Sequence, residues 1–475
     1  MLRTIEINPH EIEDKLIVPF YFAKEVINEI KGNFEIKTIE QISEAPVSGS
    51  YIPEYSKTGE RYLRVQNIRN SILNCNEDDF VFVDTLKIKV PERIRVKEGD
   101  IVMSRTTSSP SNFGNNAIIP KNFNGNIMSQ HVTRLRINGE RYYISAFLNS
   151  FYGKLQLVSA GYGSTRLELT HDELKKVIVP EIDKKQKEII MSNIKKALEC
   201  EENSLKLIKE TLDYFNDILK IDVEKLNQNK IFYINQEQIT DTFCPYFYYP
   251  LFTEYIQTLK KKFKTIKLSQ LIDIKRGEEV GSENYSVSLK KNSNDIPFIR
   301  TSDIINYEVD SYPDYYVVPE IKNQLSQDIK DGDILFTKDG KIGLSGMITN
   351  SDKCILASGI AYLRIKQTQK ICPEYVFICL SSNIGLFQAK QRTVTSSTLQ
   401  HLRPEHILEF EIPLIDEKYQ QEITKKIKQA FKLKDEKKIF IRETKKILEN
   451  YIDQKIKVEF KMLSKVYLTN LEDRL

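Results

Sequence analysis

The sequence predicts an α+β fold of two similar globular units, each followed by a long helix, with the two helices pairing as an antiparallel coiled coil. Three observations lead to this prediction. A long amphipathic segment lies in the middle of the chain, similar sequences flank it on both sides, and each copy changes from strand-like to helix-like patterns along its length. At 475 residues the chain also exceeds the usual size of one hydrophobic core, which favours two units.

The first long helix is expected over residues 183–230. Its apolar residues recur mostly every three or four positions, which places them on one stripe of a helix, and no Pro or Gly interrupts it. They are Ile190, Ile194, Ala197, Leu205, Ile208, Leu212, Phe215 and Leu219. An ordinary helix packed against a neighbour would show the same stripe. A second stripe near the end of the chain favours a helix pair; it consists of Ile423, Ile427, Ala430, Ile441, Leu448 and Ile452.

Internal similarity extends through most of the chain. Pro19 matches Pro245 and Arg64 matches Arg300, which gives offsets of 226 and 236 residues. Because the matches keep their order and the offsets stay within this narrow range, we interpret the chain as a duplication. The matched segments are Pro19–Phe22 with Pro245–Tyr248, Lys37–Ile42 with Ile266–Leu271, Arg64–Asn70 with Arg300–Asn306, Gly99–Val102 with Gly332–Leu335, Arg134–Ile137 with Tyr362–Ile365, and Ser164–Thr165 with Ser397–Thr398.

These matches place the boundaries of the units. We expect a first unit at 1–182 and the first helix at 183–230, then a second unit at 231–415 and a second helix with a C-terminal tail at 416–475. β-Branched and aromatic residues between turn-forming residues predict strands in the first unit at Tyr62–Gln66, Phe80–Val83, Asp100–Met103 and His131–Ile137. A helix is expected at Tyr143–Val158, with a counterpart at Glu374–Ala389.

Composition describes a globular protein with no membrane or metal signal. Hydrophobic residues make up 40% and charged residues 29% of the chain, and its net charge of +4 does not by itself indicate a polyanionic partner. The start of the chain has no apolar signal core. Six cysteines show no C-x-x-C pair and five histidines show no metal-ligand spacing. We therefore expect a cytoplasmic, reduced and metal-free protein.

Polar loops after the strands are the candidate site. Hydroxyl, amide, Arg and Lys side chains are those that contact phosphates and base edges of nucleic acids. In the first unit the candidate DNA-binding residues are Arg64, Asn67, Ser104, Arg105, Thr106, His131, Thr165 and Arg166. In the second unit they are Arg300, Asp303, Lys338, Lys341, Arg392, Ser397 and Thr398. Surface loops are polar in most proteins, but paired positions in a duplicated scaffold favour two different ligand half-sites.

Catalytic motifs give no support for an enzyme. The sequence has no phosphate-binding P-loop, no Asn/Asp-Pro-Pro-aromatic tetrapeptide of adenine methyltransferases and no Ser–His–Asp arrangement. Glu-x-Lys triplets occur at Glu29–Lys31, Glu35–Lys37 and Glu459–Lys461, but such triplets arise freely in a chain with 70 Lys/Arg and 66 Asp/Glu. We assign no catalytic or metal-binding residue and interpret the chain as a binding protein.

In order, the repeated motifs resemble the specificity (S) subunit of type I restriction–modification systems. The resemblance rests on Gly-Asp-Ile-Val/Leu at Gly99 and Gly332, on Ser-Thr followed by a Leu and then Val/Ile-Pro, and on Gln-x-x-x-Ile or Gln-x-Glu-Ile at the start of each long helix. It implies two target-recognition domains that each read half of a split DNA sequence, with the helices as a spacer. The first copy departs from the family at Lys185-Gln-Lys, and the tail Val458–Leu475 has no assigned role.

The resemblance also implies partners and a place in phage defence and DNA methylation. Methyltransferase (M) subunits, two of them, would dock on the helices, and restriction (R) subunits would join through the complex. S-adenosylmethionine, Mg²⁺ and ATP would bind those partners and not this chain. The residues expected on the partner-binding helices are Ile190, Ile194, Ile208, Leu212, Ile427, Ile441 and Leu448. Two alternatives stay open, a defence nuclease with an unrecognised active site and a coiled-coil adaptor that does not bind DNA.

Overall fold

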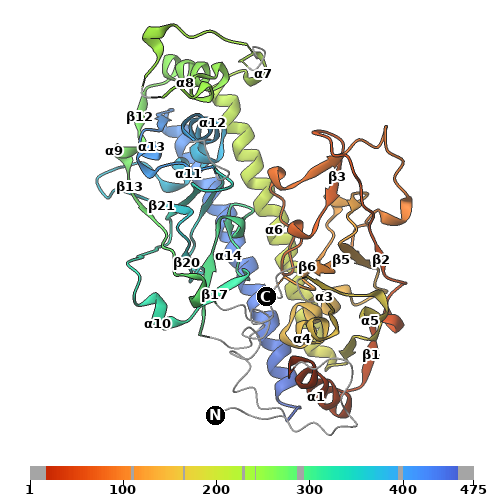
Figure 1. Cartoon of the computed structure of the whole chain (residues 1–475). Coiled ribbons are helices and arrows are strands. Elements are labelled where there is room, and N and C mark those ends of the chain that lie inside the picture. Colours follow the sequence, from red (N-terminus) through yellow and green to blue (C-terminus); the bar gives the residue numbers. More distant parts are fainter. Residues whose placement is uncertain are drawn as a thin grey trace.

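Two long helices, α6 (Lys184–Leu219) and α14 (Glu417–Asp453), run side by side through the middle of the molecule (Figure 1). They run in opposite directions, as shown by the hydrogen bond that Tyr214, near the end of α6, donates to Glu422, near the start of α14 (2.6 Å). This computed structural model describes residues 18–107, 112–163, 166–226, 231–240, 242–285, 294–393 and 400–457. The mixed helix and strand class expected from the sequence is confirmed.

The first long helix is shorter than expected. Its start is fixed by Asp183, whose carboxylate accepts from the backbone of Lys185 (2.9 Å) and Gln186 (3.2 Å). It ends at Leu219 instead of reaching residue 230, because Lys220 adopts a left-handed conformation (φ 48°). Lys262 donates to the terminal carbonyls of Leu219 and Lys220, which satisfies part of this helix end. A separate short helix, α7 (Val223–Leu226), follows.

The half of the chain before α6 is a small α+β unit. Its helices are α1 (Val18–Asn33), α2 (Ile39–Ile42), α3 (Arg141–Asn149), α4 (Phe151–Ala160) and α5 (His171–Lys176). Its strands are β1 (Ile36–Thr38), β2 (Val47–Ser48), β3 (Glu60–Leu63), β4 (Val81–Val83), β5 (Ile101–Ser104), β6 (Thr106–Thr107), β7 (Asn116–Ile118), β8 (Ile127–Met128), β9 (Val132–Leu135), β10 (Leu167–Glu168) and β11 (Ile178–Pro180).

The second half repeats this arrangement between α6 and α14. Its helices are α8 (Pro250–Lys262), α9 (Leu268–Leu271), α10 (Pro319–Lys322), α11 (Pro373–Ser381), α12 (Asn383–Arg392) and α13 (Pro404–Leu408). Its strands are β12 (Thr265–Lys267), β13 (Ile272–Arg276), β14 (Ile296–Ile299), β15 (Ile304–Ile305), β16 (Glu308–Val309), β17 (Tyr315–Val317), β18 (Ile334–Thr337), β19 (Ser345–Met347), β20 (Ile355–Leu356), β21 (Ile360–Ile365) and β22 (Glu411–Pro413).

Sheet topology is the same in the two halves. The larger sheet has the order β2-β9-β5-β7 in the first half and β13-β21-β18-β19 in the second, and both are antiparallel. The smaller sheets have the orders β4-β3-β8 and β17-β14-β20, each with one parallel pair. A two-stranded ladder, β1 with β11 or β12 with β22, closes each unit. Order and strand direction therefore agree with the duplication seen in the sequence.

The helix expected at Tyr143–Val158 is divided into α3 and α4 at Ser150. Ser150 has an extended conformation and its side chain caps α4 by accepting from the backbone of Gly153 (3.3 Å). A Cβ atom on Gly153 would lie 2.2 Å from the carbonyl oxygen of Phe147, so only glycine fits this corner. Ser382 and Gly385 divide α11 from α12 in the same way.

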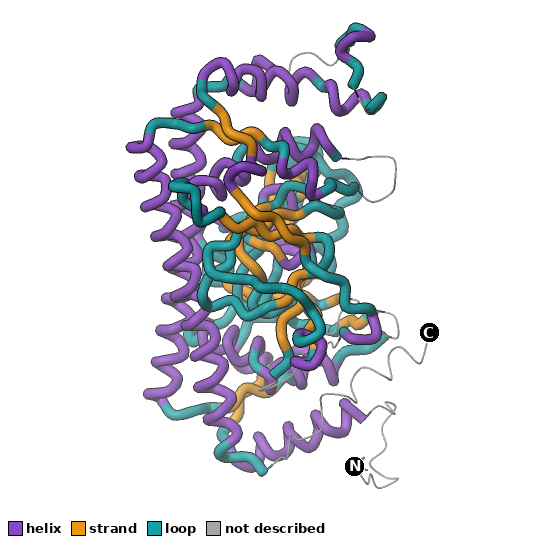
Figure 2. The backbone as a smooth tube through the Cα atoms, turned by 90° about the vertical axis from the view of Figure 1, so that its left-hand side faces the viewer, coloured by secondary structure: helices purple, strands orange, loops and turns teal. Residues whose placement is uncertain are grey.

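Each globular core is completed by the long helix that belongs to the other half. Leu448, Ile452 and Ile456, in and just after α14, pack into the core of the first half. Conversely, Ile208 and Phe215 of α6 pack into the core of the second half, with Leu219 beside them. In the view turned by 90°, the helix pair forms one long edge of the molecule, and the globular parts lie beside it (Figure 2). Among the described residues, no helix is long and apolar enough to cross a membrane.

Candidate nucleic-acid interface

Six polar residues of the first half gather where β6 pairs with β10. We call them the Arg105 cluster: Ser48, Arg105, His131, Arg166, Glu168 and His171. The Arg105 guanidinium donates to Ser48 Oγ (2.8 Å) and forms an ion pair with Glu168. Arg166 is exposed, and the side chain of Arg105 keeps 19% of its surface accessible. The cluster therefore presents two guanidinium groups beside one carboxylate at the surface.

Both histidines of the Arg105 cluster favour the neutral form. Burial lowers the pKa of His131, and the charges of Arg166 and Arg105 lower it further. Burial and Arg105 lower the pKa of His171 in the same way. A neutral imidazole offers one hydrogen-bond donor and one acceptor, whereas Arg offers donors only. The cluster can thus meet acceptors such as phosphate and guanine O6 as well as donors on a base edge.

The second half carries a different set of side chains at the equivalent place. We call Lys338, Asp339, Lys341 and His401 the Lys338 cluster. Lys338 Nζ donates to Asp339 (2.7 Å), and His401 Nδ1 is paired with the other oxygen of that carboxylate. Lys338 is buried with 5% of its side chain exposed, whereas Lys341 and His401 are each 47% exposed. A DNA contact in this half therefore falls to Lys341 and His401 more readily than to Lys338.

The two clusters stand on the same backbone frame. In each half the loop residue that follows the strand is held between two neighbouring segments by equivalent backbone hydrogen bonds. These bonds run from Arg105 N to His131 O (3.0 Å) and from Leu169 N to Arg105 O (3.0 Å) in the first half, and from Lys338 N to Gly359 O (2.9 Å) and from Leu402 N to Lys338 O (2.8 Å) in the second. Glu168 and His401 occupy equivalent positions, so one half places an acid where the other places an imidazole.

The repeated Arg-x-x-Asn/Asp motifs lie inside the molecule. Asn67 and Asp303 are completely buried and cap short turns by accepting from the backbone of Arg64 and Arg300, each at 2.9 Å. Arg64 donates to the carbonyl of Asp79 (3.0 Å), and Arg300 stacks on the ring of Tyr315 and pairs with Asp314. Because a buried side chain cannot touch a base edge, the geometry favours a structural role for Asn67 and Asp303 over the predicted DNA contact.

Each candidate loop also reaches across to the other half. Lys341 of the second half forms an ion pair with Asp79 of the first half, which is buried. Reciprocally, Asn112 of the first half donates to Asp314 of the second half. Asp79 and Asp314 both accept from, or lie beside, the Arg of their own repeated motif. The loops after β6 and β18 thus join the halves as well as bordering the two clusters.

The remaining candidates divide into buried, displaced and undescribed residues. Ser104 and Thr106 are buried, so their hydroxyls are not at the surface. Arg392 stacks on Phe410 (5.7 Å) and hydrogen-bonds to Gln391 (3.0 Å) on α12, and burial lowers its pKa. Thr165, Ser397 and Thr398 lie outside the described residues.

The apolar residues expected on partner-binding helices face the interior. Leu212 is partly buried, and the other six, Ile190, Ile194, Ile208, Ile427, Ile441 and Leu448, are buried within the chain itself. They hold the two helices and the two cores together and cannot touch a partner directly. A partner docking on the helix pair would instead meet its polar outer face, where Lys195, Lys206 and Lys432 are exposed.

Several cluster members were missed by sequence reasoning. Ser48, Glu168, His171, Asp339 and His401 come from segments without an obvious motif. A usable signal existed for two of them, because Glu168 follows Ser164–Thr165 as closely as His401 follows Ser397–Thr398. Among the described residues, no group of three or more His, Cys, Asp or Glu is arranged to hold a metal ion.

One comparison with known proteins, a match to a domain model, agrees with the resemblance seen in the sequence. Residues 260–443 match the model of the type I restriction modification DNA specificity domain. No curated protein matches the chain. Among solved structures, the type I restriction–modification S subunit from M. genitalium shares 13% identity over 90% of this chain and 97% of its own, with a TM-score of 0.29. The HsdS subunit from Thermoanaerobacter tengcongensis shares 14% identity over 89% and 97%, with a TM-score of 0.27.

The family assignment rests on the domain match. That match covers the segment from the last turn of α8 through most of α14, which includes the Lys338 cluster and the larger and smaller sheets of the second half. The first half repeats the same sheet topology outside the matched residues. The resemblance to specificity subunits is thereby confirmed, with residues 260–443 of this chain matching the type I restriction modification DNA specificity domain.

Proposed function

We propose that this chain is the DNA-binding specificity subunit of a type I restriction–modification complex and that each globular half reads one part of a split target. The observation that carries this proposal is the shared backbone frame with different side chains in the Arg105 and Lys338 clusters. A duplicated reader needs the same scaffold twice, but two half-sites of different sequence need different contacts.

In this proposal the domains are the two target-recognition domains, 1–182 and 231–415, and the helices that follow them form an antiparallel coiled-coil spacer. The spacer separates the two clusters and offers its polar outer face to methyltransferase subunits, through which restriction subunits join. The chain itself has no catalytic role. S-adenosylmethionine, Mg²⁺ and ATP belong to the partner subunits, and a chain that only binds DNA needs none of them for recognition.

Half-site competition tests the division of labour. The complex of the chain with its methyltransferase partner is bound to a DNA target that is altered in one half at a time. Arg166→Ala and His401→Ala remove exposed members of the two clusters. We expect Arg166→Ala to lower discrimination at one half-site by about 1–3 kcal/mol and to leave the other unchanged, and His401→Ala to do the reverse.

A matched control and the opposing outcomes complete this experiment. Lys87→Ala removes a positive charge from an exposed residue of the first half outside the Arg105 cluster, and it should change neither half-site. A loss of affinity that is equal for all sequences and becomes smaller as the salt concentration rises would identify a phosphate contact. If the complex shows no sequence preference, or if each substitution affects both half-sites equally, the proposal is wrong.

A further inference from the structure

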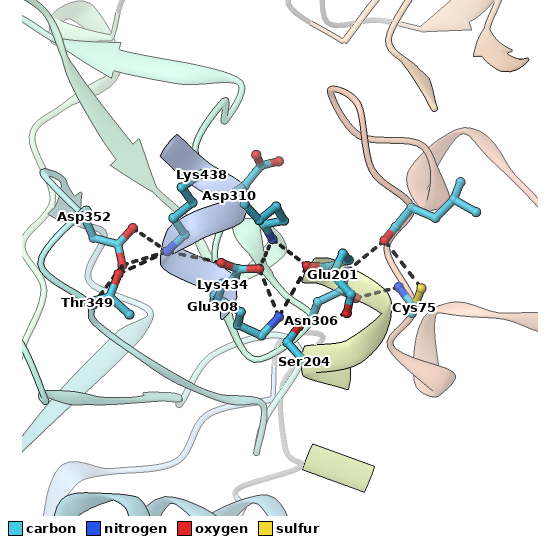
Figure 3. A network of polar contacts seen from close by, with 12 residues as sticks. Cys75, Glu201, Ser204, Asn306, Glu308, Asp310, Thr349, Asp352, Lys434 and Lys438 are labelled. Atoms are coloured by element: carbon cyan, nitrogen blue, oxygen red, sulfur yellow. Dashed lines mark hydrogen bonds and ion pairs between the residues drawn. The ribbon is translucent and has the colours of Figure 1, made fainter. Parts of the chain in front are cut away.

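A group of buried charged residues lies where the two long helices, α6 and α14, meet both halves of the molecule (Figure 3). We call it the buried ion network: Glu201 of α6, Glu308 of β16, Asp352 after β19, and Lys434, Lys437 and Lys438 of α14. No side chain of the six is more than 9% exposed. Three lysines face three carboxylates, so the network is neutral as a whole.

The contacts of the network connect the helices to each other and to the second half. Lys437 Nζ lies 2.7 Å from Glu201 on α6 and also contacts Glu308, which Lys434 contacts at 3.1 Å. Lys438 binds Asp352 at 2.7 Å and Glu308 at 3.2 Å. Burial alone would raise the pKa of Glu308, but the three lysines hold it below its ordinary value, so the carboxylate stays ionised. These pairs are close enough to make each charge depend on the others.

The first half joins the same network through one amide. Asn306 Nδ2 donates to Glu201 (2.6 Å) and to the carbonyl of Leu73 in the first half (2.8 Å), while Asn306 Oδ1 accepts from the backbone of Cys75 (2.7 Å). An apolar group beside it draws one residue from each half and one from each long helix: Ile72, Ala197, Ile305 and Ile441. Both helices therefore carry a connection to both halves at a single level near their midpoints.

Outside this level the two helices meet mainly through apolar side chains. Ile190 and Ile194 lie in one apolar cluster with Leu448 and Ile452, while Ile208 and Phe215 share another with Ile423 and Ile427. Apolar surfaces tolerate a shift of one helical turn, about 5.4 Å, because one aliphatic group replaces another. A shift of that size would pull Lys437 from Glu201 and leave buried charges without partners.

We propose that the buried ion network fixes the register of α6 against α14 and thereby the separation of the Arg105 and Lys338 clusters. Helix length alone does not fix that separation, since two smooth helices of constant length can slide. This inference deepens the proposed function, because in a DNA-binding specificity subunit the register would set the number of base pairs between the half-sites. The residues of the network act as positioning residues and do not themselves contact DNA.

The chain supplies its own reporter of register. Cys200 of α6 lies opposite Glu436 of α14, with Sγ 4.0 Å from Oε2. In the full-length Glu436→Cys variant, mild oxidation should cross-link the two thiols in the native register. Leu433→Cys and Phe440→Cys place the second thiol about one turn away in either direction. In an otherwise unchanged chain we expect the yield at position 436 to exceed both neighbours by at least about tenfold, since displacing buried charge pairs shifts an equilibrium by more than one factor of ten.

Removing the charges should abolish this preference. The background that combines Glu201→Met, Glu308→Met, Lys434→Met and Lys437→Met keeps side-chain volume and leaves Lys438 with Asp352. We expect cross-linking there to spread over the three positions, so that the preference falls below about threefold. Lys437→Arg, which retains the charge, is the matched control and should keep the native preference. An unchanged preference for position 436 in the uncharged background would overturn the inference.

A milder variant covers the case in which the uncharged chain does not fold. Glu201→Gln with Lys437→Gln keeps hydrogen-bonding groups and removes only the charges of the central pair, and it too should lose preference; unaltered cross-linking there would also refute the proposal. Binding of the complex to DNA targets whose spacer is one base pair longer or shorter is the second measurement. A parent complex that shows no sequence-specific binding contradicts the proposed function alone, whereas an unchanged cross-linking pattern contradicts this inference alone.

Discussion

The two halves of the molecule share one backbone and differ in the charges they place on it. At equivalent buried turns, Asn67 and Asp303 cap Arg64 and Arg300 with the same 2.9 Å hydrogen bond, but only Asp303 can carry a charge. Burial raises the pKa of Asp303 to about 6, although Arg69 from the first half opposes this shift. Geometry is thus preserved by the duplication, while electrostatics is free to diverge where the other half supplies a compensating cation.

The same contrast holds at the surface. The Arg105 and Lys338 clusters use equivalent backbone hydrogen bonds, yet an acid faces an arginine in one half and an imidazole faces an acid in the other. Divergence at the clusters does not disturb the sheets, because the frame is made of backbone groups. Substitutions can therefore separate what the halves share from what distinguishes them.

The largest expected effect concerns the packing of each long helix into the core of the other half. Leu448→Ala creates a cavity in the core of the first half although Leu448 follows the second half in sequence, and Ile208→Ala does the same to the second half. Both residues are completely buried, so we expect a loss of about 3–5 kcal/mol in the free energy of unfolding for each. Hydrogen exchange should show Leu448→Ala loosening α1 and α3 before any element of the second half. Faster hydrogen exchange confined to the second half would contradict the packing of Leu448 in the core of the first half.

A slightly smaller loss is expected at the two helix corners. Gly153→Ala and Gly385→Ala place a Cβ atom 2.2 Å and 2.1 Å from the backbone oxygens of Phe147 and Leu380. Because backbone must move in both cases, we expect each to lower the free energy of unfolding by about 2–3 kcal/mol, measured by denaturant titration. Gly32→Ala is the control, since nothing lies within 4 Å of that position, and it should be neutral or stabilising. A large difference between the two corners would show that the halves are packed differently.

The difference in buried charge predicts a gain in stability. The raised pKa of Asp303, about 6 against an ordinary value of 3.8, means that ionisation is harder in the folded chain than in the unfolded chain. Folding therefore loses free energy as pH rises through 4 to 6, and a cost of about 3 kcal/mol is present at pH 7. Asp303→Asn copies the first half and should stabilise the chain by this amount at pH 7 and not at pH 4. Arg69 also lies 3.8 Å from Asp310, so its charge would still have a carboxylate nearby in that variant. A variant less stable than the parent at pH 7 would show that the charge is needed.

The smallest effect is expected where the halves are alike. Tyr143 and Tyr375 donate to the carbonyls of Pro180 (2.5 Å) and Pro413 (2.6 Å), which fastens α3 and α11 to the closing strands. Tyr143→Phe and Tyr375→Phe each leave a buried carbonyl without this donor. We expect similar losses of about 1–2 kcal/mol, measured by thermal unfolding of both single variants and the double variant. Strongly unequal losses would mean that the two equivalent hydrogen bonds contribute differently to the stability of their halves.

Much of the fold was predictable because its signals are local or repeated. The stripe from Ile190 to Leu219 predicted α6, whose end at Leu219 and not at residue 230 depends on a contact from Lys262, 42 residues beyond Lys220. The predicted strand at Tyr62–Gln66 occurs as β3 at Glu60–Leu63, because Val65–Asn67 turns to let Asn67 cap Arg64. Hydrophobic periodicity identifies elements, but tertiary hydrogen bonds decide where they stop.

The candidate site was less predictable. Polarity and repetition singled out Arg105 and His131, and the structure brings them into one cluster because Arg105 directly follows β5 and His131 directly precedes the neighbouring strand β9. Sequence could not show that Asn67, Asp303 and Lys338 turn inward, because their burial depends on residues that are distant in sequence, such as Arg69 for Asp303 and Gly359 and Leu402 for Lys338. The burial of three lysines of α14 was equally hidden, since nothing in the sequence distinguishes Lys434, Lys437 and Lys438 from the other lysines of this helix.

The core of the first half is completed by α14, which is made last, and this order has a consequence for synthesis on the ribosome. Ile190, which lies in the first core, is made 258 residues before Leu448, which completes that core. At roughly 5–20 residues per second, about 13–50 s separate the two. During that time the first half has an open apolar groove along α6 where α14 will later lie. A nascent chain in this condition is a substrate for chaperones, and its native fold is reached only after the last helix has left the exit tunnel.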